Sequence, residues 1–219
     1  MVKHIIVLNG LPESGKDTFA SFVAKHFKGG VVMHSTIDTV KLMALDWFGV
    51  EFDVDKNLKK RRLWSDIKDA WTRYNNGPFK ELKQLVCVLD KRDDDPVCVI
   101  THVREPEEIA RIKKEYGTRC ATVLVKRMAV AGAEVSNHAD QDIENYLYDV
   151  TINNDSGVED LERLAKRFVS FLNSFCGVLV GDVCRFDMHM RHTTALSQQG
   201  RKDFEHLSEK DNTDAYQSR

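Results

Sequence analysis

A glycine-bounded loop near the N-terminus restricts the possible folds of this 219-residue chain more than any other feature. The loop runs Gly10-Leu11-Pro12-Glu13-Ser14-Gly15-Lys16-Asp17-Thr18 and follows the apolar run His4–Asn9, which has the composition of a buried strand. The residues after it place apolar side chains at helical spacing: Phe19, Phe22, Val23 and Phe27. A strand, a tight turn and a helix in direct succession predict an α/β fold built on a parallel sheet.

The loop also has the residues that a phosphate-binding turn requires. A chain of phosphate groups is held by converging backbone N–H groups, and glycine lets the backbone approach closely enough. The following helix adds partial positive charge at its N-terminus, and Lys16 adds a full one. The pattern therefore predicts a P-loop whose backbone binds a polyphosphate. A chance occurrence of the same letters in a turn is the alternative, against which the flanking strand and helix argue.

Asp17 departs from the usual P-loop pattern, in which Ser or Thr follows the lysine and ligates Mg²⁺. The carboxylate of Asp17 is a candidate metal ligand, either directly or through a water molecule. Thr18 is then a candidate contact to a phosphate oxygen. The sequence leaves open which of these arrangements holds.

The rest of the chain alternates short apolar runs with longer amphipathic stretches. The runs that predict strands buried on both faces are Val31–His34, Val97–Val103, Cys120–Lys126 and Tyr148–Asn153. This alternation predicts a doubly wound fold whose ligand lies outside the carboxyl ends of the strands. We expect one domain over residues 1–186 with a helical insertion over 56–90. Residues 187–219 are polar and aperiodic, and we expect a disordered tail there.

Composition excludes several other classes of protein. The formal net charge is −2, so no basic excess predicts binding to nucleic acid or to a membrane surface. The five cysteines include no CxxC pair, which argues against a zinc cluster or a disulfide framework. The most apolar later stretch, Phe168–Cys184, is too short and too polar to span a bilayer. We expect a cytoplasmic protein with a small-molecule partner; the oligomeric state is left open.

Three segments resemble a known superfamily. Gly15-Lys16-Asp17-Thr18 resembles the loop of bacteriophage deoxynucleoside monophosphate kinases and is similar to the Gly-Lys-Gly-Thr of adenylate kinases. Val99–Arg104 and Asp149–Asn154 are looser matches to two strands of the wider nucleoside monophosphate kinase-like superfamily, which includes dephospho-coenzyme A kinase. The resemblance covers about Met1 to Asn173. It implies a three-layer P-loop NTPase fold with a five-stranded parallel sheet, a helical acceptor-binding arm, a lid, and ATP and Mg²⁺ as cofactors.

The third strand of the chain ends in a second pair of candidates. In the resembling kinases the arginine that matches Arg104 touches the acceptor or its phosphate; an exposed helix-capping arginine is the alternative. His102 stands where the superfamily has an aspartate, and histidine is a poor ligand for Mg²⁺. Either Asp17 or Asp38 takes the carboxylate role, or activity is altered. A structural histidine at a strand end is an equal alternative.

Further candidates lie on the expected helices. Ser35 and Asp38 have the spacing of a helix cap, and the resemblance implies that Asp38 and Lys41 on this helix bind the acceptor. A surface ion pair is the alternative for both. In the basic cluster Lys56–Arg62, Arg61 or Arg62 is the candidate phosphate ligand, and the other cations form a solvated face.

The segment over residues 127–138 contains Gly132 and lacks periodicity, which fits a lid that excludes water, with Arg127 facing the phosphates. His138 and Asp140 begin the next helix, and His138 fits a helix cap. The resemblance places Asn154 near the adenine base, and a turn asparagine is an equal alternative.

The resemblance implies ATP-dependent phosphorylation of a nucleoside or deoxynucleoside monophosphate. A monophosphate acceptor is already nucleophilic, so the absence of an obvious histidine–carboxylate pair fits this activity. Two alternatives stay open: a kinase for another small metabolite, such as dephospho-coenzyme A, and a nucleotide-binding switch with little transfer.

Overall fold

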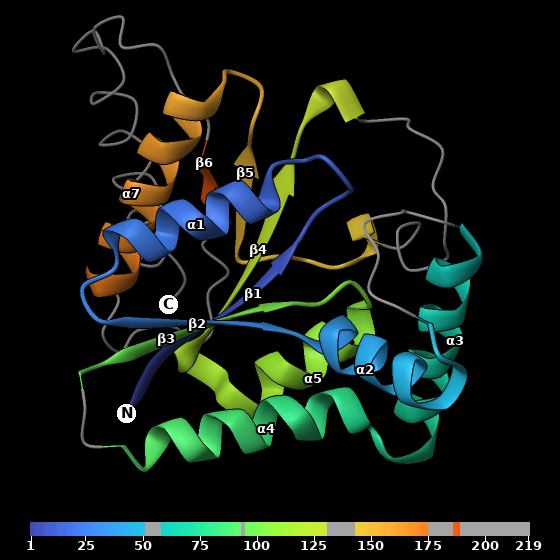
Figure 1. Ribbon diagram of the computed structural model, residues 1–219. Helices are drawn as coiled ribbons and strands as arrows, with labels where there is room; N and C mark the ends of the chain where they lie inside the picture. The colour runs from blue at the N-terminus through green and yellow to red at the C-terminus, as the bar shows by residue number, and fades with distance from the viewer. Residues whose placement is uncertain (51–57, 93–94, 131–142, 175–185, 189–219) are drawn as a thin grey trace, which may run out of the picture. The chain divides into compact units, whose positions relative to one another are not determined.

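The computed structural model describes residues 1–50, 58–92, 95–130, 143–174 and 186–188. They contain a sheet of six parallel strands in the order β2-β3-β1-β4-β5-β6 (Figure 1). The strands are β1 (Val2–Asn9), β2 (Gly30–Ser35), β3 (Val97–His102), β4 (Cys120–Lys126), β5 (Val150–Asn153) and β6 (Phe186–Met188). The first strand of the chain therefore lies inside the sheet, paired with β3 on one side and β4 on the other.

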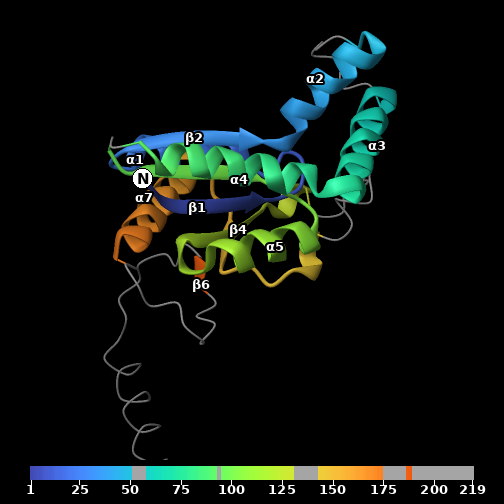
Figure 2. The ribbon, with the colours of Figure 1, turned by 90° about the horizontal axis from the view of Figure 1, so that it is seen from below.

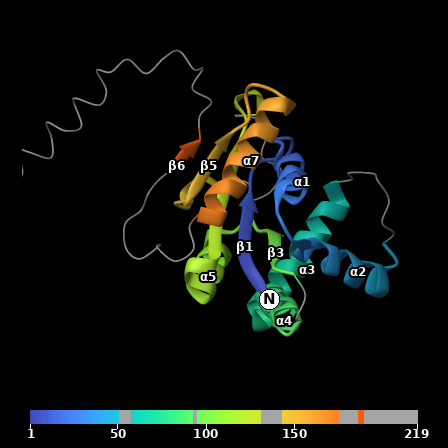
Figure 3. The same cartoon turned by 90° about the vertical axis from the view of Figure 1, so that its left-hand side faces the viewer.

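Helices cover both faces of this sheet. The helices are α1 (Lys16–His26), α2 (Thr36–Phe48), α3 (Leu58–Asn75), α4 (Gly77–Asp90), α5 (Pro106–Tyr116) and α7 (Val158–Ser174). Short 3-10 turns lie at η1 (Gly117–Arg119), η2 (Met128–Val130) and η3 (Ile143–Asn145). α1 and α7 lie side by side on one face (Figures 1 and 3), where the rings of Phe19 and Phe168 are 5.7 Å apart. α4 and α5 cover the other face.

The alternation of side chains along β1 explains these three layers. Ile5 and Val7 are buried in one core cluster together with residues of α4 and α5, such as Leu82 and Ile112. Ile6 and Leu8 alternate with them and are also buried. A strand that is apolar on both faces is stable only when both faces are covered, which is the reason that β1 lies between two helical layers.

α2 and α3 extend beyond the carboxyl end of β2, away from the layers over the sheet (Figure 2). They pack on one another through a small separate core of Val40, Ala44 and Ile67. Gly49 ends α2 in the left-handed conformation, with φ of 63°. The two helices therefore flank the edge at which a parallel sheet binds its ligands.

The expected parallel α/β fold is confirmed, with differences in detail. The sheet has a sixth strand, the three residues of β6, beyond the five that were expected. Ser35 occupies the cap position of α2 but makes no side-chain hydrogen bond there, so the predicted cap is wrong. β5 begins at Val150 rather than at Tyr148, and just before it the Asp149 amide donates to the Thr122 hydroxyl at 2.9 Å.

Some predictions lie outside the described residues. The expected lid is described only over 127–130, so residues 131–138, His138 and Asp140 are outside. The same holds for residues 189–219 of the expected tail. Among the helices that the structure describes, none has the length and apolar character needed to cross a membrane.

Candidate active site

The loop between β1 and α1 turns through three residues with positive φ. Gly10 and Gly15 have φ of 156° and 90°, and Glu13 has φ of 65°. Gly15 stands at the N-terminal cap of α1 in the left-handed conformation. A non-glycine residue such as Glu13 in this region is strained and persists only where its surroundings impose the conformation. Here the Ser14 amide donates to the Leu11 carbonyl oxygen at 3.2 Å, which closes the turn.

Both glycines are required by close packing against the rest of the fold. A Cβ atom on Gly10 would lie 2.6 Å from the main-chain oxygen of Val125 on β4. A Cβ atom on Gly15 would overlap the side-chain amide of Asn154. That amide donates a hydrogen bond of 2.9 Å to the carbonyl oxygen of Ser14. Asn154, predicted to approach the adenine, is in contact with the main chain of the loop.

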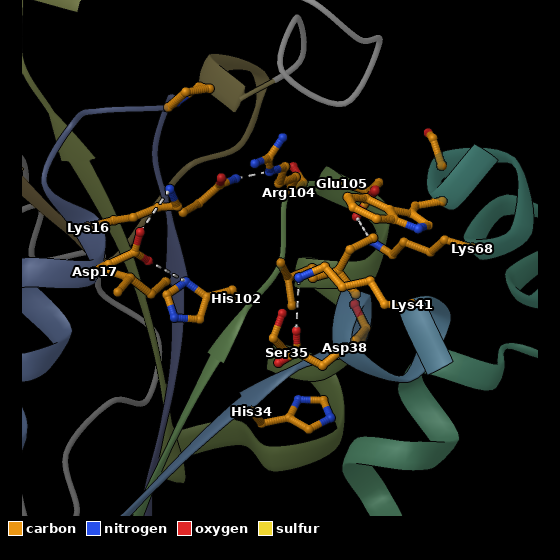
Figure 4. Close-up of a pocket in the computed structure, with 18 of the residues that line it drawn as sticks. Lys16, Asp17, His34, Ser35, Asp38, Lys41, Lys68, His102, Arg104 and Glu105 are labelled. Atoms are coloured by element: carbon orange, nitrogen blue, oxygen red, sulfur yellow. Dashed lines mark hydrogen bonds and ion pairs between the residues drawn. The ribbon is translucent and has the colours of Figure 1, made fainter. Parts of the chain in front are cut away.

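Three charged or titratable groups meet at the start of α1 (Figure 4). Lys16 Nζ lies 3.7 Å from Asp17 Oδ2, and Asp17 Oδ1 lies 3.8 Å from His102 Nδ1 at the end of β3. The Lys16 side chain is 15% exposed, whereas that of Asp17 is 79% exposed. Asp17 is therefore free to reach toward a ligand, while Lys16 is held within the site.

Burial is the largest influence on His102. It lowers the pKa of the imidazole below its ordinary value, and the charges of Lys16 and Arg104 act in the same direction. Asp17 and Asp38 oppose this shift without reversing it. His102 is therefore neutral at neutral pH, and it leaves the positive charge of the site to lysine and arginine.

The site fits a magnesium nucleotide. The buried Ser14 Oγ in the glycine-bounded turn has no hydrogen-bond partner within the described residues. Asp17 supplies hard carboxylate oxygen, which Mg²⁺ prefers. In the described part of the chain no three His, Cys, Asp or Glu side chains are grouped to hold a metal. A single carboxylate suits Mg²⁺, which is commonly bound by one or two carboxylates together with phosphates.

A cavity of about 760 Å³ opens beside the loop. It lies outside the carboxyl ends of β1, β2 and β3, and α2 and α3 form its far wall. Its polar and charged lining includes Lys16, Asp17, Asp38, Lys41, Arg61, Ser65, Lys68, His102, Arg104 and Glu105. The volume is within the range of about 300–1,000 Å³ that is usual for small-molecule sites.

Several of the predicted site residues line this cavity. Lys16 and Asp17 come from the start of α1, Asp38 and Lys41 from α2, Arg61 from α3, and Arg104 follows β3. Lys41 Nζ lies 3.4 Å from Asp38 Oδ1 and 5.4 Å from the centre of the Trp64 ring. The cavity thus combines cations with one large aromatic surface.

Two predicted arginines are not brought into the cavity. Arg62 is exposed and is not part of the lining, while its neighbour Arg61 contributes to it. Arg127 follows β4, is exposed, and is also outside the lining. Of the loop residues, Pro12 and Glu13 line the cavity, and Thr18 is exposed on the first turn of α1.

A buried ion cluster in the cavity wall was not predicted. Lys68 Nζ on α3 lies 2.6 Å from Glu105 Oε2 and 3.4 Å from Glu108 Oε2 at the start of α5. Burial opposes the charge on Lys68, but the two carboxylates raise its pKa above the ordinary value. Burial raises the pKa of Glu108. For Glu105 burial is the largest single influence and also acts upward, but the charge of Lys68 and the hydrogen bonds to the carboxylate together lower the pKa.

A second polar cluster lies beneath the cavity and was also missed. His34 Nδ1 is 2.8 Å from Thr101 Oγ1, and His34 Nε2 is 3.8 Å from Glu81 Oε2 on α4. The Thr39 hydroxyl on α2 donates to the other oxygen of Glu81. The cluster therefore joins β2, β3 and α4 to the helix that carries Asp38 and Lys41. The sequence did not predict this cluster, because His34 and Glu81 are far apart in the chain and belong to no motif.

Comparisons with known proteins give only distant likenesses. No protein-family model matches the sequence, and no curated protein matches it. Shikimate kinase from Aquifex aeolicus vf5 is 14% identical with a TM-score of 0.41, over 79% of this chain and 99% of that one. APS kinase from Mycobacterium tuberculosis is 13% identical with a TM-score of 0.41, over 78% and 98%. Thymidylate kinase from Ehrlichia chaffeensis is 10% identical with a TM-score of 0.26, over 96% and 100%.

These values are too low to support an inference about activity, so the fold is judged on the chain itself. β1 leads through the glycine-bounded loop into α1, and β1 lies between β3 and β4 in a parallel sheet. Helices cover both faces, and the cavity opens at the carboxyl edge beside the loop. The chain has a three-layer α/β fold in which a glycine-bounded loop joins the interior strand β1 to α1 at the carboxyl edge of the sheet.

Proposed function

We propose that this protein transfers the γ-phosphoryl group of magnesium ATP to a nucleoside or deoxynucleoside monophosphate. One observation carries the proposal. A single cavity is lined by Lys16 and Asp17 of the loop, by Lys41 of α2 and Arg61 of α3, and by Arg104, which follows β3. Cations that reach one space from separate elements suit two phosphate groups that must meet, because phosphoryl transfer depends on positioning and on stabilising charge.

The loop would hold the donor. Its backbone amides and the N-terminus of α1 face a polyphosphate, and Lys16 stabilises the charge on the group in transfer. Asp17 offers the carboxylate that would hold Mg²⁺. The metal, when bound, would supply positive charge that offsets the negative charge of the phosphates. Arg127 is proposed to contact the phosphates from the segment after β4.

The far wall would hold the acceptor. Arg104 and Arg61 are suited to its phosphate, since a guanidinium group binds phosphate through two parallel hydrogen bonds. The Trp64 ring gives a planar base an apolar surface to pack against, and Asp38 offers an acceptor for hydroxyl or amino groups. A monophosphate is ionised at neutral pH and therefore requires no residue to remove a proton from it.

A panel of acceptors tests this proposal. The purified protein is incubated with magnesium and γ-labelled ATP, together with each common ribonucleoside and deoxyribonucleoside monophosphate, dephospho-coenzyme A and several hydroxylated metabolites. We expect label in one or more nucleoside diphosphates. Label found only in a compound that is not a nucleotide would overturn the assignment of the acceptor. Tight ATP binding without transfer to any acceptor would favour a nucleotide-dependent switch.

One observation favours a second candidate, a kinase for a hydroxylated metabolite. His102 lines the cavity as a neutral imidazole, and a neutral imidazole nitrogen can accept the proton of a hydroxyl group. A hydroxyl acceptor needs such a base, whereas a monophosphate does not. The same panel separates the two candidates. Transfer to a hydroxylated metabolite that is lost in His102→Gln would support this second candidate.

A further inference from the structure

We propose that Asn9 is a positioning residue that fixes the ATP-binding loop and Arg104 relative to one another, and that the Tyr148 hydroxyl holds Asn9 in place. The proposal deepens the proposed function and rests on it. Asn9 is the last residue of β1, and its side chain is among the most buried polar groups in the described structure, with the residue 1% exposed.

Four hydrogen bonds define the arrangement. Asn9 Oδ1 accepts from the Gly10 amide at 2.8 Å. Asn9 Nδ2 donates to the carbonyl oxygen of Arg104 at 3.1 Å and to the Tyr148 hydroxyl at 2.7 Å. The Tyr148 hydroxyl in turn donates to the carbonyl oxygen of Ile143 at 3.0 Å. Both amide protons and the hydroxyl proton therefore have an acceptor.

This network permits only one orientation of the Asn9 amide. If the amide were rotated by half a turn, its NH₂ group would face the Gly10 N–H, and two donors would oppose one another. The Tyr148 hydroxyl can accept from Asn9 because its own proton is used by Ile143. An unpaired buried donor costs about 1–3 kcal/mol, so the arrangement is strongly preferred.

The position of Asn9 gives the network its functional meaning. The pairing of β1 with β3 ends at Leu8 and His102, and beyond this point the two strands lead into the loop and toward Arg104. The Asn9 side chain forms hydrogen bonds to both segments. It thus fixes the position of the Gly10 amide at the start of the loop and of the Arg104 carbonyl group.

Such a link matters because phosphoryl transfer requires the groups that bind the donor and the groups that bind the acceptor to be correctly positioned relative to one another. Reacting groups must be held within about 0.5 Å of the productive geometry, and a misplacement of 1 Å can cost about 10²-fold in rate. Lys16 follows the loop and Arg104 follows β3, and the sheet pairing that aligns these strands has already ended. Asn9 extends that alignment to the residues that contact the phosphates.

The test compares Tyr148→Phe with the control Tyr146→Phe. Tyr146 packs edge-to-face on Tyr148, with ring centres 5.0 Å apart, and takes no part in the four hydrogen bonds above. Three measurements are made on wild type and both variants: the hydrogen exchange rate of the Gly10 amide without ligand, thermal melting, and kcat and KM for ATP and for the acceptor found in the panel.

We expect Tyr148→Phe to exchange the Gly10 amide at least about tenfold faster than wild type, because the Asn9 amide loses one of its two acceptors and is held less firmly. We expect its kcat to fall about tenfold and its acceptor KM to rise, with a nearly unchanged KM for ATP. Tyr146→Phe should have wild-type exchange and kinetics. Asn9→Ala should show a larger kinetic loss in the same direction, provided that it folds.

Each other outcome counts against the proposal in a distinct way. Unchanged exchange in Tyr148→Phe would overturn the link whatever the activity of the protein. Faster exchange with wild-type kinetics would show that the network is structural only. Equal kinetic losses in the two tyrosine variants would assign the effect to the loss of any tyrosine hydroxyl in this region and not to the Asn9 network. A wild-type protein that transfers phosphate to no acceptor would overturn the proposed function, and the positioning role would fall with it.

Discussion

Lys68 Nζ lies 2.6 Å from Glu105 Oε2, and this pair joins α3 to the residue that directly follows Arg104. The Lys68 side chain is 12% exposed, and Glu108 adds a second buried carboxyl group 3.4 Å away. The cation is therefore the shared partner of two acidic groups, of which the Glu108 side chain is 5% exposed and that of Glu105 is 28% exposed. Its removal leaves their charge uncompensated.

We predict that Lys68→Met lowers the free energy of unfolding by about 3–5 kcal/mol, as is usual when one partner of a buried ion pair is removed. Urea unfolding measures this change. The control is Lys83→Met, because Lys83 pairs with Glu115 at the surface and should contribute at most about 1 kcal/mol. Equal losses in the two variants would show that the buried cluster contributes no more than a surface pair.

Lys16→Ala should lower phosphoryl transfer by about 10²–10³-fold, the loss that removal of one preorganised charge-stabilising group produces in enzymes. The melting temperature should be close to that of wild type, because Lys16 pairs only loosely with the exposed Asp17. The control is Lys25→Ala on the same helix, whose partner Glu162 lies outside the cavity. Normal turnover in Lys16→Ala with normal melting would contradict the assignment of the site.

Arg104→Ala should affect the acceptor more than ATP. A charge-assisted hydrogen bond contributes about 1.5–3 kcal/mol, so we expect kcat/KM for the acceptor to fall about 10- to 100-fold. The affinity for a non-hydrolysable ATP analogue, measured by calorimetry, should change much less. Arg62→Ala is the matched control, because Arg62 is an exposed arginine outside the cavity. A loss confined to ATP binding would indicate that Arg104 contacts ATP and not the acceptor.

Glu81 should make stability depend on acid pH. Burial alone would raise its pKa, but the hydrogen bonds with His34 and Thr39 lower it below the ordinary 4.5. The stabilising contribution of Glu81 is therefore complete above pH 4.5 and is lost as the pH falls through the lower value in the folded protein. Glu81→Gln removes this dependence and keeps an oxygen that accepts from Thr39.

Urea unfolding of wild type and Glu81→Gln across the acid range checks this prediction. Wild type should be the more stable protein near neutral pH, and its advantage should shrink as the pH falls below about 4.5. Stability curves that stay parallel over this range would show that the carboxylate of Glu81 is not stabilised by its partners.

The part of the site that is local in sequence was predictable. The loop from Gly10 to Thr18 has an apolar strand before it and an amphipathic helix after it, so its conformation is determined by residues that are close in the sequence. Arg104 was predictable for the same reason, since it follows a buried strand directly. In both cases the sequence pattern and the structure depend on the same few residues.

The parts that depend on distant packing were not predictable. Lys68 has the sequence environment of a solvated helix face, and its burial arises only where α3 meets the start of α5. Asn9 and Tyr148 form their hydrogen bond across 139 positions of the chain. Ser35 is at the cap position of α2, but its side chain makes no capping hydrogen bond although the sequence spacing is correct. A local motif therefore indicates that a contact is possible and does not show that it forms.

The interior position of β1 has a consequence for synthesis on the ribosome. This strand is translated first, yet its two neighbours are β3, which begins at Val97, and β4, which ends at Lys126. At about 5–20 residues per second, the nascent strand waits on the order of 5–25 s before both partners have been made. Val125 of β4 packs against Gly10, and Asn154, which is made later still, donates to the Ser14 carbonyl oxygen. The glycine-bounded turn can therefore be completed only after more than half of the chain has been translated.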